Sequence, residues 1–208
     1  MARLIQSPVI PGVVDTLLEE PDPGPARLAA VVCHPHPLHG GTMHNKVVHR
    51  MARALRHKGA VVLRFNFRKV GEVEAGVEDA RAALAWLRER YPDLPWALAG
   101  FSFGARVATT LACEEPGAQF VMAAGFPTRW GPPAHLETCA VRKIFLQSTH
   151  DQYGPRAEFE QMYGGFAEPK QLRWIESADH FFASGLDKFE AAAGEVIEPA
   201  GESRYKPC

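Results

Sequence analysis

The sequence has no long apolar run and almost no charge excess. No stretch of its 208 residues approaches the ~18–20 consecutive apolar residues that a membrane-spanning helix needs. Lysine plus arginine total 23 against 24 for aspartate plus glutamate, so the formal net charge is −1. A charge this small gives no electrostatic reason to bind nucleic acid or an anionic membrane surface. We therefore expect neither as a partner.

Cysteine is also scarce. The four cysteines, Cys33, Cys113, Cys139 and Cys208, are far apart, and no two form a Cys-x-x-Cys pair. This usage is typical of reduced thiols and not of a disulfide framework. Residues 1–20 lack the uninterrupted apolar segment of a secretory signal and contain acidic residues early. The sequence therefore predicts reduced cysteines and a cytoplasmic protein.

The material that is present suits a globular domain. Hydrophobic residues make up 46% of the chain and charged residues 23%, which is enough apolar material for one sizeable core. We expect one domain over residues 1–208, with a loose polar tail from about residue 198. We expect a monomer or a small homo-oligomer.

Short apolar runs alternate with amphipathic stretches along the chain. Strands are expected within residues 9–18 and at residues 28–33, 60–65, 96–100, 119–125, 142–149 and 171–175. Helices are expected between Thr42, as the N-cap, and Gly59, and at residues 77–90, 103–114, 156–163 and 184–196. This alternation predicts an α/β fold with a mostly parallel central sheet and helices on both faces. The segment between residues 125 and 142 is too short for a large lid domain.

The strongest motif is Gly-Phe-Ser-Phe-Gly at residues 100–104, a Gly-x-Ser-x-Gly pattern. It lies between a predicted strand and a predicted helix, which is the setting of a nucleophile elbow. The glycines allow the strained turn that raises the serine Oγ above the end of the strand. The turn also places the serine at a helix N-terminus, where N–H groups face developing negative charge. The motif predicts Ser102 as a nucleophile, and the alternative is a glycine-rich turn without chemistry.

A serine nucleophile needs a base, and α/β hydrolases carry Ser, then Asp or Glu, then His along the chain. His180 lies in the loop after the last predicted strand, and Asp151 follows the strand at residues 142–149. In this arrangement Asp151 accepts a hydrogen bond from the His180 imidazole and selects its tautomer. The alternative is that His180 is a surface residue and that Asp151 is a turn residue or a helix cap.

Other residues compete for these two roles. His135 lies in a proline-rich loop with no suitably placed acidic residue before it. His150 is adjacent to Asp151 and cannot easily be both the base and downstream of its acid. Asp179 is the rival acid, but neighbours on a loop seldom point toward each other.

The most unusual stretch, residues 33–46, reads Cys-His-Pro-His-Pro-Leu-His-Gly-Gly-Thr-Met-His-Asn-Lys. Its histidines invite a metal site, yet their spacing matches neither a Cys-x-x-Cys nor a His-Glu-x-x-His unit. The prolines also extend the chain and send alternate side chains to opposite sides. We therefore predict no metal here.

An oxyanion loop fits this stretch better. In α/β hydrolases one oxyanion donor is the backbone N–H after the nucleophile, here that of Phe103. The second comes from the loop after an early strand. His36 or Leu38 is the candidate for this second donor, because Pro35 and Pro37 have no N–H.

These segments together resemble a known group. HPHPLHGGTMHNKVV at residues 34–48, FNFR at residues 65–68, the elbow, and the late Asp151 and His180 are similar to small bacterial α/β hydrolases of the dienelactone-hydrolase-like or CocE/NonD-like esterase group. The resemblance spans about residues 5–185. It implies the α/β-hydrolase fold without a large cap, a triad of Ser102, Asp151 and His180, and carboxylesterase activity on small esters.

The chain departs from this group in two places. Relatives follow Asn-Phe-Arg with a longer glycine-rich loop at the mouth of the active site, whereas residues 66–77 are several residues short. Either the loop is lost here or a segment is missing. True dienelactone hydrolases carry cysteine at the elbow, so Ser102 argues against that particular activity.

The sequence thus predicts a serine hydrolase that cleaves small carboxylic esters through an acyl-enzyme on Ser102, without a cofactor. The lack of a lid favours a shallow site and short acyl chains. Phe101, Phe103, Phe126 and Trp130 are candidates for the acyl pocket, although each could belong to the core. Thioesterase, peptidase and acyltransferase activities use the same triad and stay open. A non-catalytic or metal-binding protein on a hydrolase scaffold is the rival of another class.

Overall fold

The computed structural model describes residues 4–22, 24–68 and 71–197. Its strands are β1 (Leu4–Gln6), β2 (Thr16–Glu19), β3 (Leu28–Cys33), β4 (Ala60–Phe65), β5 (Trp96–Phe101), β6 (Ala118–Ala124), β7 (Lys143–Ser148) and β8 (Lys170–Ile175). Its α-helices are α1 (Lys46–His57), α2 (Val73–Arg90), α3 (Phe103–Glu114), α4 (Arg156–Gly164) and α5 (Leu186–Val196). Two short 3-10 helices, η1 (Pro37–His39) and η2 (Ala134–Glu137), lie in connecting segments.

The strands of the described residues form one eight-stranded sheet in the order β1-β2-β4-β3-β5-β6-β7-β8. The strands from β3 to β8 are parallel to one another, whereas β1 and β2 are antiparallel at one edge. Parallel strands place their carboxyl ends along one edge, where α/β folds commonly bind ligands. Cys33 in β3 pairs with Gly100 in β5, so the loops after these two strands begin side by side.

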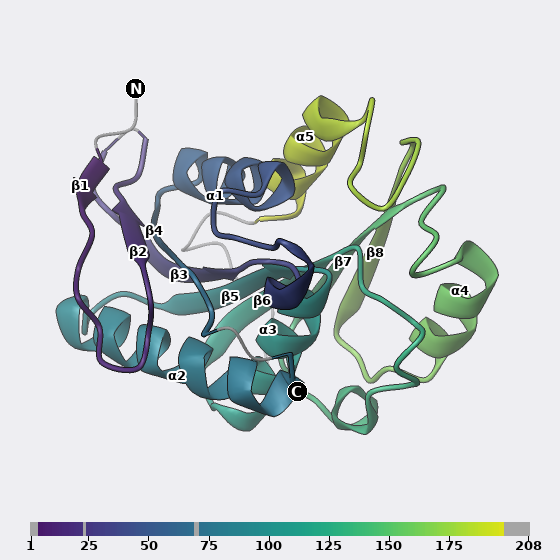
Figure 1. Cartoon of the computed structure of the whole chain (residues 1–208), viewed down its shortest axis with the longest axis horizontal. Coiled ribbons are helices and arrows are strands. Elements are labelled where there is room, and N and C mark those ends of the chain that lie inside the picture. The colour runs from purple at the N-terminus through teal and green to yellow at the C-terminus, as the bar shows by residue number, and fades with distance from the viewer. Residues whose placement is uncertain (1–3, 23, 69–70, 198–208) are drawn as a thin grey trace, which may run out of the picture.

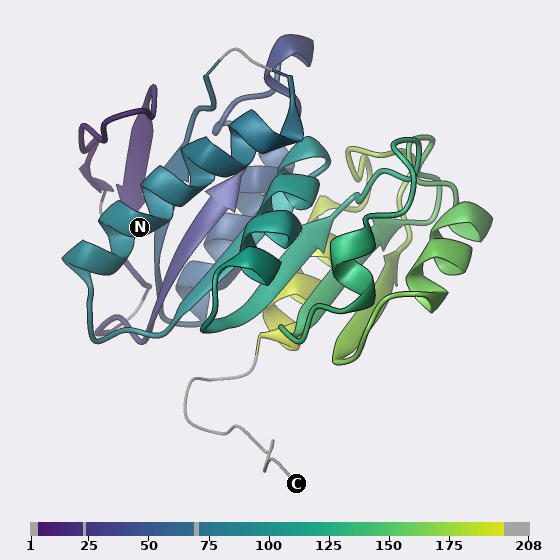
Figure 2. The same cartoon turned by 90° about the horizontal axis from the view of Figure 1, so that it is seen from below.

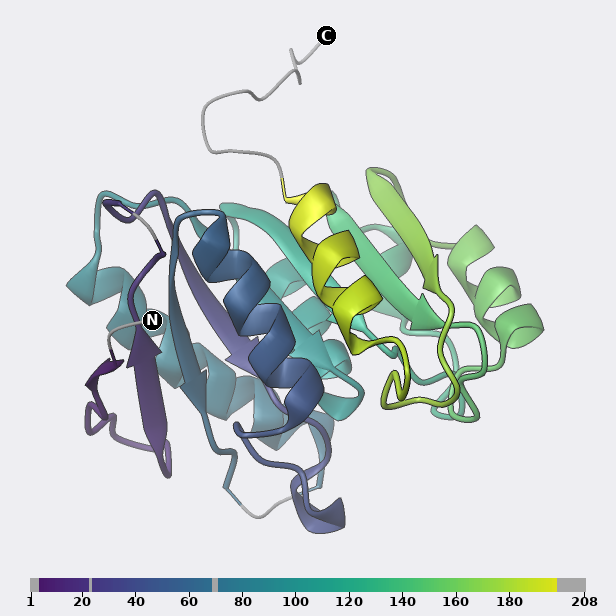
Figure 3. The ribbon, with the colours of Figure 1, turned by 90° about the horizontal axis from the view of Figure 1, so that it is seen from above.

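Helices cover both faces of the sheet. Figure 1 shows α1 and α5 above the sheet and α2 and α3 below it. Seen from above, α1 and α5 lie next to each other (Figure 3), and seen from below, α2 lies next to α3 (Figure 2). Within the described residues no lid domain interrupts this α/β architecture. The predicted fold class is therefore confirmed.

Burial explains why the central strands form. Every residue of β3, β4, β5 and β7 is buried. Alternate residues point to opposite faces of a sheet, so both faces of these strands need an apolar cover. Val32 and Val62 belong to the cluster that includes residues of α1 and α5, whereas Val31 and Leu63 belong to the cluster that includes residues of α2 and α3.

Most predicted elements agree with the structure to within a few residues. At the start of the chain the prediction is wrong in part: β1 (Leu4–Gln6) precedes the expected segment at residues 9–18, and only the end of that segment belongs to a strand, β2, because Pro11 and Gly12 form a turn. A further correction concerns the start of α1. Asn45, and not Thr42, caps this helix, because Asn45 Oδ1 accepts hydrogen bonds from the N–H groups of Val47 (2.9 Å) and Val48 (3.4 Å). Thr42 Oγ1 instead accepts from the His44 N–H. The predicted tail at residues 198–208 and two residues of the short loop after Arg68 lie outside the described residues. None of the described helices is both long and apolar enough to cross a membrane.

The prediction of reduced cysteines is wrong for two of the four. Cys113, near the end of α3, and Cys139, just before β7, form a disulfide with their Cα atoms 5.4 Å apart. They are 26 residues apart along the chain, and the crossover through β6 brings them together. Cys33 is a buried free thiol, and Cys208 lies outside the described residues. Cysteine usage therefore no longer supports the expectation of a cytoplasmic location.

Candidate active site

Ser102 lies in the sharp turn between β5 and α3 that the sequence predicts. Its backbone adopts φ 57° and ψ −115°, a left-handed conformation that non-glycine residues rarely adopt. The Ser102 N–H donates to the Ala124 carbonyl at 2.9 Å, and the Ser102 carbonyl accepts from the Ala105 N–H at 3.0 Å. These two bonds join the turn to β6 and to the first turn of α3. The strain is thus maintained by well-formed structure on both sides.

The two glycines of the elbow are required by close packing. A Cβ on Gly100 would lie 2.0 Å from the Gly104 carbonyl oxygen, and a Cβ on Gly104 would lie 2.4 Å from the Cys33 carbonyl oxygen. Each contact is between backbone atoms, which cannot move aside as a flexible side chain can. The Gly-x-Ser-x-Gly pattern therefore allows α3 to approach both β5 and the end of β3.

Asp151 and His180 meet at the same edge of the sheet. His180 Nδ1 lies 2.8 Å from Asp151 Oδ2, and both side chains are almost fully buried. Asp151 Oδ1 accepts hydrogen bonds from the N–H groups of Tyr153 (2.8 Å) and Gly154 (3.0 Å), which orient the carboxylate. The His180 backbone N–H donates to Gln152 Oε1 at 3.1 Å. With Nδ1–H donating to the carboxylate, Nε2 is the nitrogen that can accept a proton.

The rival residues lie elsewhere. His150 is exposed, and its Nδ1 is 2.9 Å from the Ser177 carbonyl oxygen. His135 is half-buried, and burial together with the nearby Arg106 lowers its pKa to about 4. Asp179 Oδ1 accepts from the N–H groups of two residues of its own loop, at 2.9 and 3.0 Å. Of the three histidines after Ser102, only His180 shares a pocket with it among the described residues.

The two oxyanion candidates in the histidine-rich loop differ in the structure. The Leu38 N–H already donates to His36 Nδ1 at 3.3 Å, and the Leu38 side chain is 60% exposed. His36 lines the pocket, and its N–H has no partner among the described residues. The Phe103 N–H, the first of α3, is likewise without a partner in the described part of the chain. The geometry therefore favours the pair of Phe103 and His36 over the pair with Leu38.

His34 holds this loop in place. Its Nδ1 lies 2.5 Å from the Pro35 carbonyl oxygen, and its Nε2 accepts a hydrogen bond from the Phe67 N–H at 2.9 Å. One ring nitrogen donates and the other accepts, which requires the neutral imidazole. Burial agrees with this assignment, because it lowers the pKa of His34 to about 4. His34 thereby ties the start of the loop to the segment after β4.

The remaining histidines of the loop do not converge. His36 and His39 stack with their ring centroids 4.4 Å apart and line the pocket, whereas His44 and His49 are exposed. No three His, Cys, Asp or Glu side chains gather as metal ligands in the described part of the chain.

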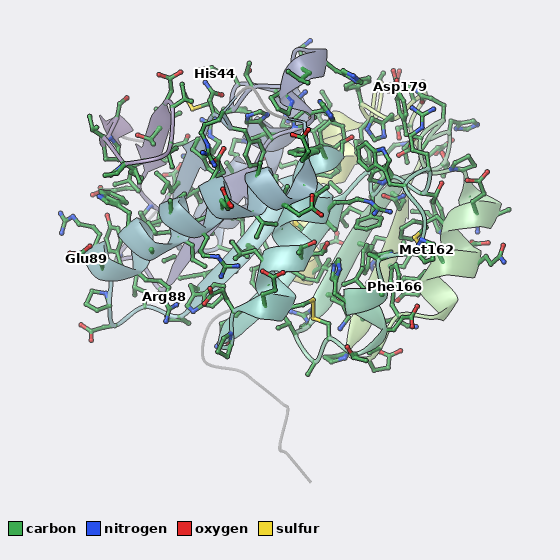
Figure 4. The ribbon with its side chains drawn as sticks, turned by 60° about the horizontal axis from the view of Figure 1, so that its bottom comes forward. His44, Arg88, Glu89, Met162, Phe166 and Asp179 are labelled. Carbon is green, nitrogen blue, oxygen red and sulfur yellow. A yellow bond between two sulfur atoms is a disulfide. The ribbon has the colours of Figure 1, made fainter. Side chains whose placement is uncertain are left out.

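Ser102 and His180 open into one pocket of about 130 Å³. Its other lining residues come from four loops and are Pro35, His36, His39, Gly40, Gly41, Asn45, Pro127, Arg129, Trp130, Tyr153 and Phe181. All four loops follow the carboxyl ends of strands: β3, β6, β7 and β8. His44 and Asp179 are adjacent in sequence to the pocket residues Asn45 and His180, and Figure 4 shows them along one edge of the molecule. The disulfide lies far from them in this view.

The predicted acyl-pocket residues need correction. Trp130 lines the pocket, but Phe101, Phe103 and Phe126 do not. All three phenylalanines are fully buried in core clusters. Phe101 still contributes from beneath, since its ring lies 4.9 Å from the His180 ring. Phe101 and Phe103 flank Ser102 in the sequence, but the β5 pleat and the start of α3 direct their side chains into the core, and Phe126, after β6, packs in a core cluster of its own.

Several residues that shape the pocket were not predicted from the sequence. Tyr153 packs edge-on against the His180 ring at 4.8 Å and donates its N–H to Asp151. Gln147, fully buried in β7, makes two hydrogen bonds to the backbone of Phe126, at 2.6 and 3.1 Å. Arg106, four residues after Ser102, donates to the carbonyls of the loop after β6. Of these three residues, only Tyr153 could have been found from the sequence, because it follows Asp151 by two residues.

Comparison with known proteins agrees with this geometry. A family model described as an alpha/beta hydrolase domain matches residues 29–198. An uncharacterized protein of Rickettsia prowazekii is 31% identical over 184 residues, which cover 81% of this chain and 77% of that protein.

Two solved structures are similar in fold and sequence. An alpha-beta serine hydrolase homologue from Coxiella burnetii has a TM-score of 0.84 at 30% identity, over 95% of this chain and 97% of that one. A serine hydrolase without a lid from Xanthomonas campestris has a TM-score of 0.75 at 30% identity, over 94% and 92% of the two chains. Because the family model spans both the turn at Ser102 and the loop of His180, this chain belongs to the alpha/beta hydrolase family.

Proposed function

We propose that the protein is a serine esterase that cleaves small carboxylic esters through an acyl-enzyme on Ser102. One observation carries the proposal. Ser102 and His180 line the same pocket, and Asp151 holds His180 at 2.8 Å in the tautomer that a general base requires. Ser102 stands where dienelactone hydrolases carry cysteine, so the proposed substrate is a simple ester.

The chemistry divides between these side chains. His180 Nε2 removes the Ser102 hydroxyl proton while Oγ attacks the ester carbonyl, and the carbonyl π electrons move to oxygen. When the tetrahedral intermediate collapses, the bond to the alcohol oxygen breaks and His180 returns the proton to that oxygen. Water then attacks the acyl-enzyme with His180 again as base, and this step releases the acid and restores Ser102. Asp151 stays ionised throughout and stabilises the imidazolium.

Two backbone N–H groups support the proposed oxyanion site. Those of Phe103 and His36 have no other partner among the described residues, and both belong to segments next to Ser102. A preorganised donor of this kind typically contributes about 10²–10³ in rate. A pocket of about 130 Å³ fits a short acyl chain better than a long one.

A fluorophosphonate probe tests the nucleophile directly. Wild-type protein should form one covalent adduct, and digestion with mass spectrometry should place it on Ser102. The Ser102→Ala variant should not be labelled. Labelling that persists in this variant would show that another residue reacts.

A substrate panel tests the bond that is cleaved. We expect hydrolysis of 4-nitrophenyl acetate and butyrate to exceed hydrolysis of the dodecanoate, and we expect all of it to vanish in Ser102→Ala. Acyl-CoA thioesters and aminoacyl anilides belong in the same panel. Faster turnover of either class than of the short esters would contradict the assignment as an esterase.

A further inference from the structure

The charge of the active-site pocket is one-sided. Its lining includes the guanidinium of Arg129 and the imidazoles of His36, His39 and His180, and contains no Asp or Glu. Asp151 lies behind His180 and is fully buried, so a substrate in the pocket meets the imidazole and not the carboxylate. Arg129 is thus the permanent charge on the pocket wall.

A groove next to the pocket is also lined by basic and not by acidic side chains. It shares Gly40, Asn45 and Phe181 with the pocket, and its other lining residues are Thr42, His44, Lys46 and Val47. No acidic side chain lines it either. The pocket and the groove therefore each contain a cation, Arg129 in the loop after β6 and Lys46 at the start of α1.

Arg129 is not engaged by a carboxylate of the protein. Its guanidinium carbon lies 5.4 Å from the centre of the Tyr153 ring, and no acid within the described residues pairs with it. Many other arginines do pair with acids: Arg50, Arg53, Arg56, Arg64, Arg68, Arg81 and Arg156. The Arg129 side chain is exposed, so its hydrogen-bond donors remain open to a ligand.

The backbone on both sides of Arg129 is fixed. The Thr128 N–H donates to the Tyr153 carbonyl at 2.9 Å, and the Gly131 N–H donates to the Thr128 carbonyl at 2.9 Å. Arg106 Nη2 donates to the carbonyls of Pro127, at 3.3 Å, and of Gly131. A loop held in this way fixes the backbone of Arg129 at the pocket before any ligand arrives, which lowers the entropic cost of binding.

Arg106 adds positive charge behind this wall, because it contacts Trp130 but does not itself line the pocket. Its guanidinium carbon lies 5.6 Å from the centre of the ring of Trp130, the residue that follows Arg129. The Arg106 side chain is buried, and no ion pair within the described residues joins it to an acid. Its Nε has no hydrogen-bond partner. Burial lowers the pKa of Arg106 to about 10, which still leaves the group charged at neutral pH.

The same wall also offers apolar contact. Trp130, Tyr153 and Phe181 line the pocket and are 46%, 36% and 48% exposed. Such rings can cover the hydrocarbon part of a substrate. A ligand suited to this site has an apolar segment and a negative charge.

We propose that the physiological substrate class is anionic esters, in which a carboxylate or a similar anion is joined to the acyl chain, and that Arg129 binds this anion. The inference rests on the proposed esterase function. A guanidinium forms paired, charge-assisted hydrogen bonds with a carboxylate. A neutral ester of the same length gains nothing from it. Arg129 therefore sets specificity and takes no part in the bond-breaking steps.

Matched substrates test the proposal. The mono-4-nitrophenyl esters of glutaric and adipic acid carry a terminal carboxylate, and the 4-nitrophenyl esters of pentanoic and hexanoic acid are neutral partners of equal chain length. Ser102→Ala measures the uncatalysed rate to be subtracted. We expect wild-type kcat/KM to favour the anionic partner in at least one pair. In Arg129→Gln this preference, the ratio of anionic to neutral kcat/KM, should fall about tenfold.

Three controls make the result specific. Arg129→Lys keeps the charge but not the paired hydrogen bonds, so it should retain part of the preference. Arg156→Gln removes an exposed arginine of α4 that pairs with Glu160 and should leave the preference unchanged. Raising the salt concentration should reduce the preference of the wild type and not that of Arg129→Gln. Equal thermal unfolding midpoints would show that the variants are folded.

The outcomes separate the two proposals. An unchanged ratio of anionic to neutral kcat/KM in Arg129→Gln would overturn the role of Arg129. A wild-type preference for the neutral partner in both pairs would overturn the substrate class. In either case labelling of Ser102 and hydrolysis of neutral esters would leave the esterase function standing. If Ser102 is not labelled and no ester is cleaved, the esterase function itself fails.

Discussion

The Phe67 backbone N–H donates a hydrogen bond to His34 Nε2 at 2.9 Å, and this bond joins the segment after β4 to the loop after β3. His34 Nδ1–H donates to the Pro35 carbonyl, so both ring nitrogens are engaged. Protonation of Nε2 would replace the acceptor with a donor facing another donor. The loop that carries His36 is therefore held by a histidine that must stay neutral.

This arrangement predicts a loss of stability in mild acid. Burial lowers the pKa of His34 to about 4 in the folded protein, against about 6.5 when unfolded. Between these values the unfolded state binds more protons, so stability is complete above pH 6.5 and falls as the pH drops toward 4. The thermal unfolding midpoint should decrease between pH 7.5 and pH 5. In His34→Gln the decrease should be smaller.

The exposed His44 provides the control for this prediction. His44→Gln should show the same decrease as the wild type, because the His44 side chain is exposed and does not join the loop to the segment after β4. His135, whose pKa is also lowered to about 4, keeps part of the pH dependence in His34→Gln. An identical pH dependence in wild type and His34→Gln would refute the role of His34.

Asp151 offers a test that separates chemistry from folding. In Asp151→Asn the side-chain oxygen can still accept the N–H groups of Tyr153 and Gly154, so the loop should keep its shape. The amide nitrogen would face His180 Nδ1 and favour the wrong tautomer. We expect kcat on a short ester to fall by about 10³–10⁴, with an unfolding midpoint close to that of the wild type.

Asp179→Asn is the matched control. Asp179 is adjacent to His180, but its Oδ1 accepts from the Phe181 and Ala183 N–H groups, and asparagine can do the same. Activity should stay within about threefold of the wild type. If Asp179→Asn instead loses activity and Asp151→Asn keeps it, the acid is Asp179.

The elements and the three principal site residues were predictable because both follow from patterns along the chain. Burial on both faces makes β3 a continuous apolar run and β4 one that only Arg64 interrupts, and their alternation with helices favours parallel strands. In such a sheet every loop after a strand lies at the same edge. Ser102, Asp151 and His180 each follow a strand, so their order and positions indicated a common site before any distance was known.

Which side chains form the pocket wall was not predictable from the sequence. Where a side chain points depends on the pleat of the strand and on the turn that follows it, and neither shows in the identity of a residue. Phe101 and Phe126 point into the core, whereas Trp130 lines the pocket. Arg106 lies within a helix of ordinary composition, and its contacts with the loop after β6 arise from the fold alone.

The elbow predicts a sharp difference between two glycines. In Gly104→Ala the new Cβ would lie 2.4 Å from the Cys33 carbonyl oxygen, so α3 would have to move away from the end of β3. We expect a loss of about 3 kcal/mol or more in the free energy of unfolding, or no folded protein. At Gly164 in α4 a Cβ meets no atom within 4 Å.

Gly164→Ala should therefore be neutral, or stabilising by up to about 1 kcal/mol, because alanine is the better helix former. Urea unfolding of both variants, followed by circular dichroism, measures the difference. Equal stability of Gly104→Ala and the wild type would show that the elbow is not packed as described.

The disulfide between Cys113 and Cys139 predicts a stability effect without an effect on catalysis. It closes a loop with a sequence separation of 26 residues, for which the loss of chain entropy in the unfolded state corresponds to about 3–4 kcal/mol. Dithiothreitol should lower the unfolding midpoint of the wild type but not that of a Cys113→Ser, Cys139→Ser double variant, which should already be lower. Because Cys113 lies near the end of α3 opposite to Ser102, kcat should change little. A double variant as stable as the oxidised wild type would show that the bond contributes nothing, and a large loss of kcat would show that it holds the pocket loop after β6.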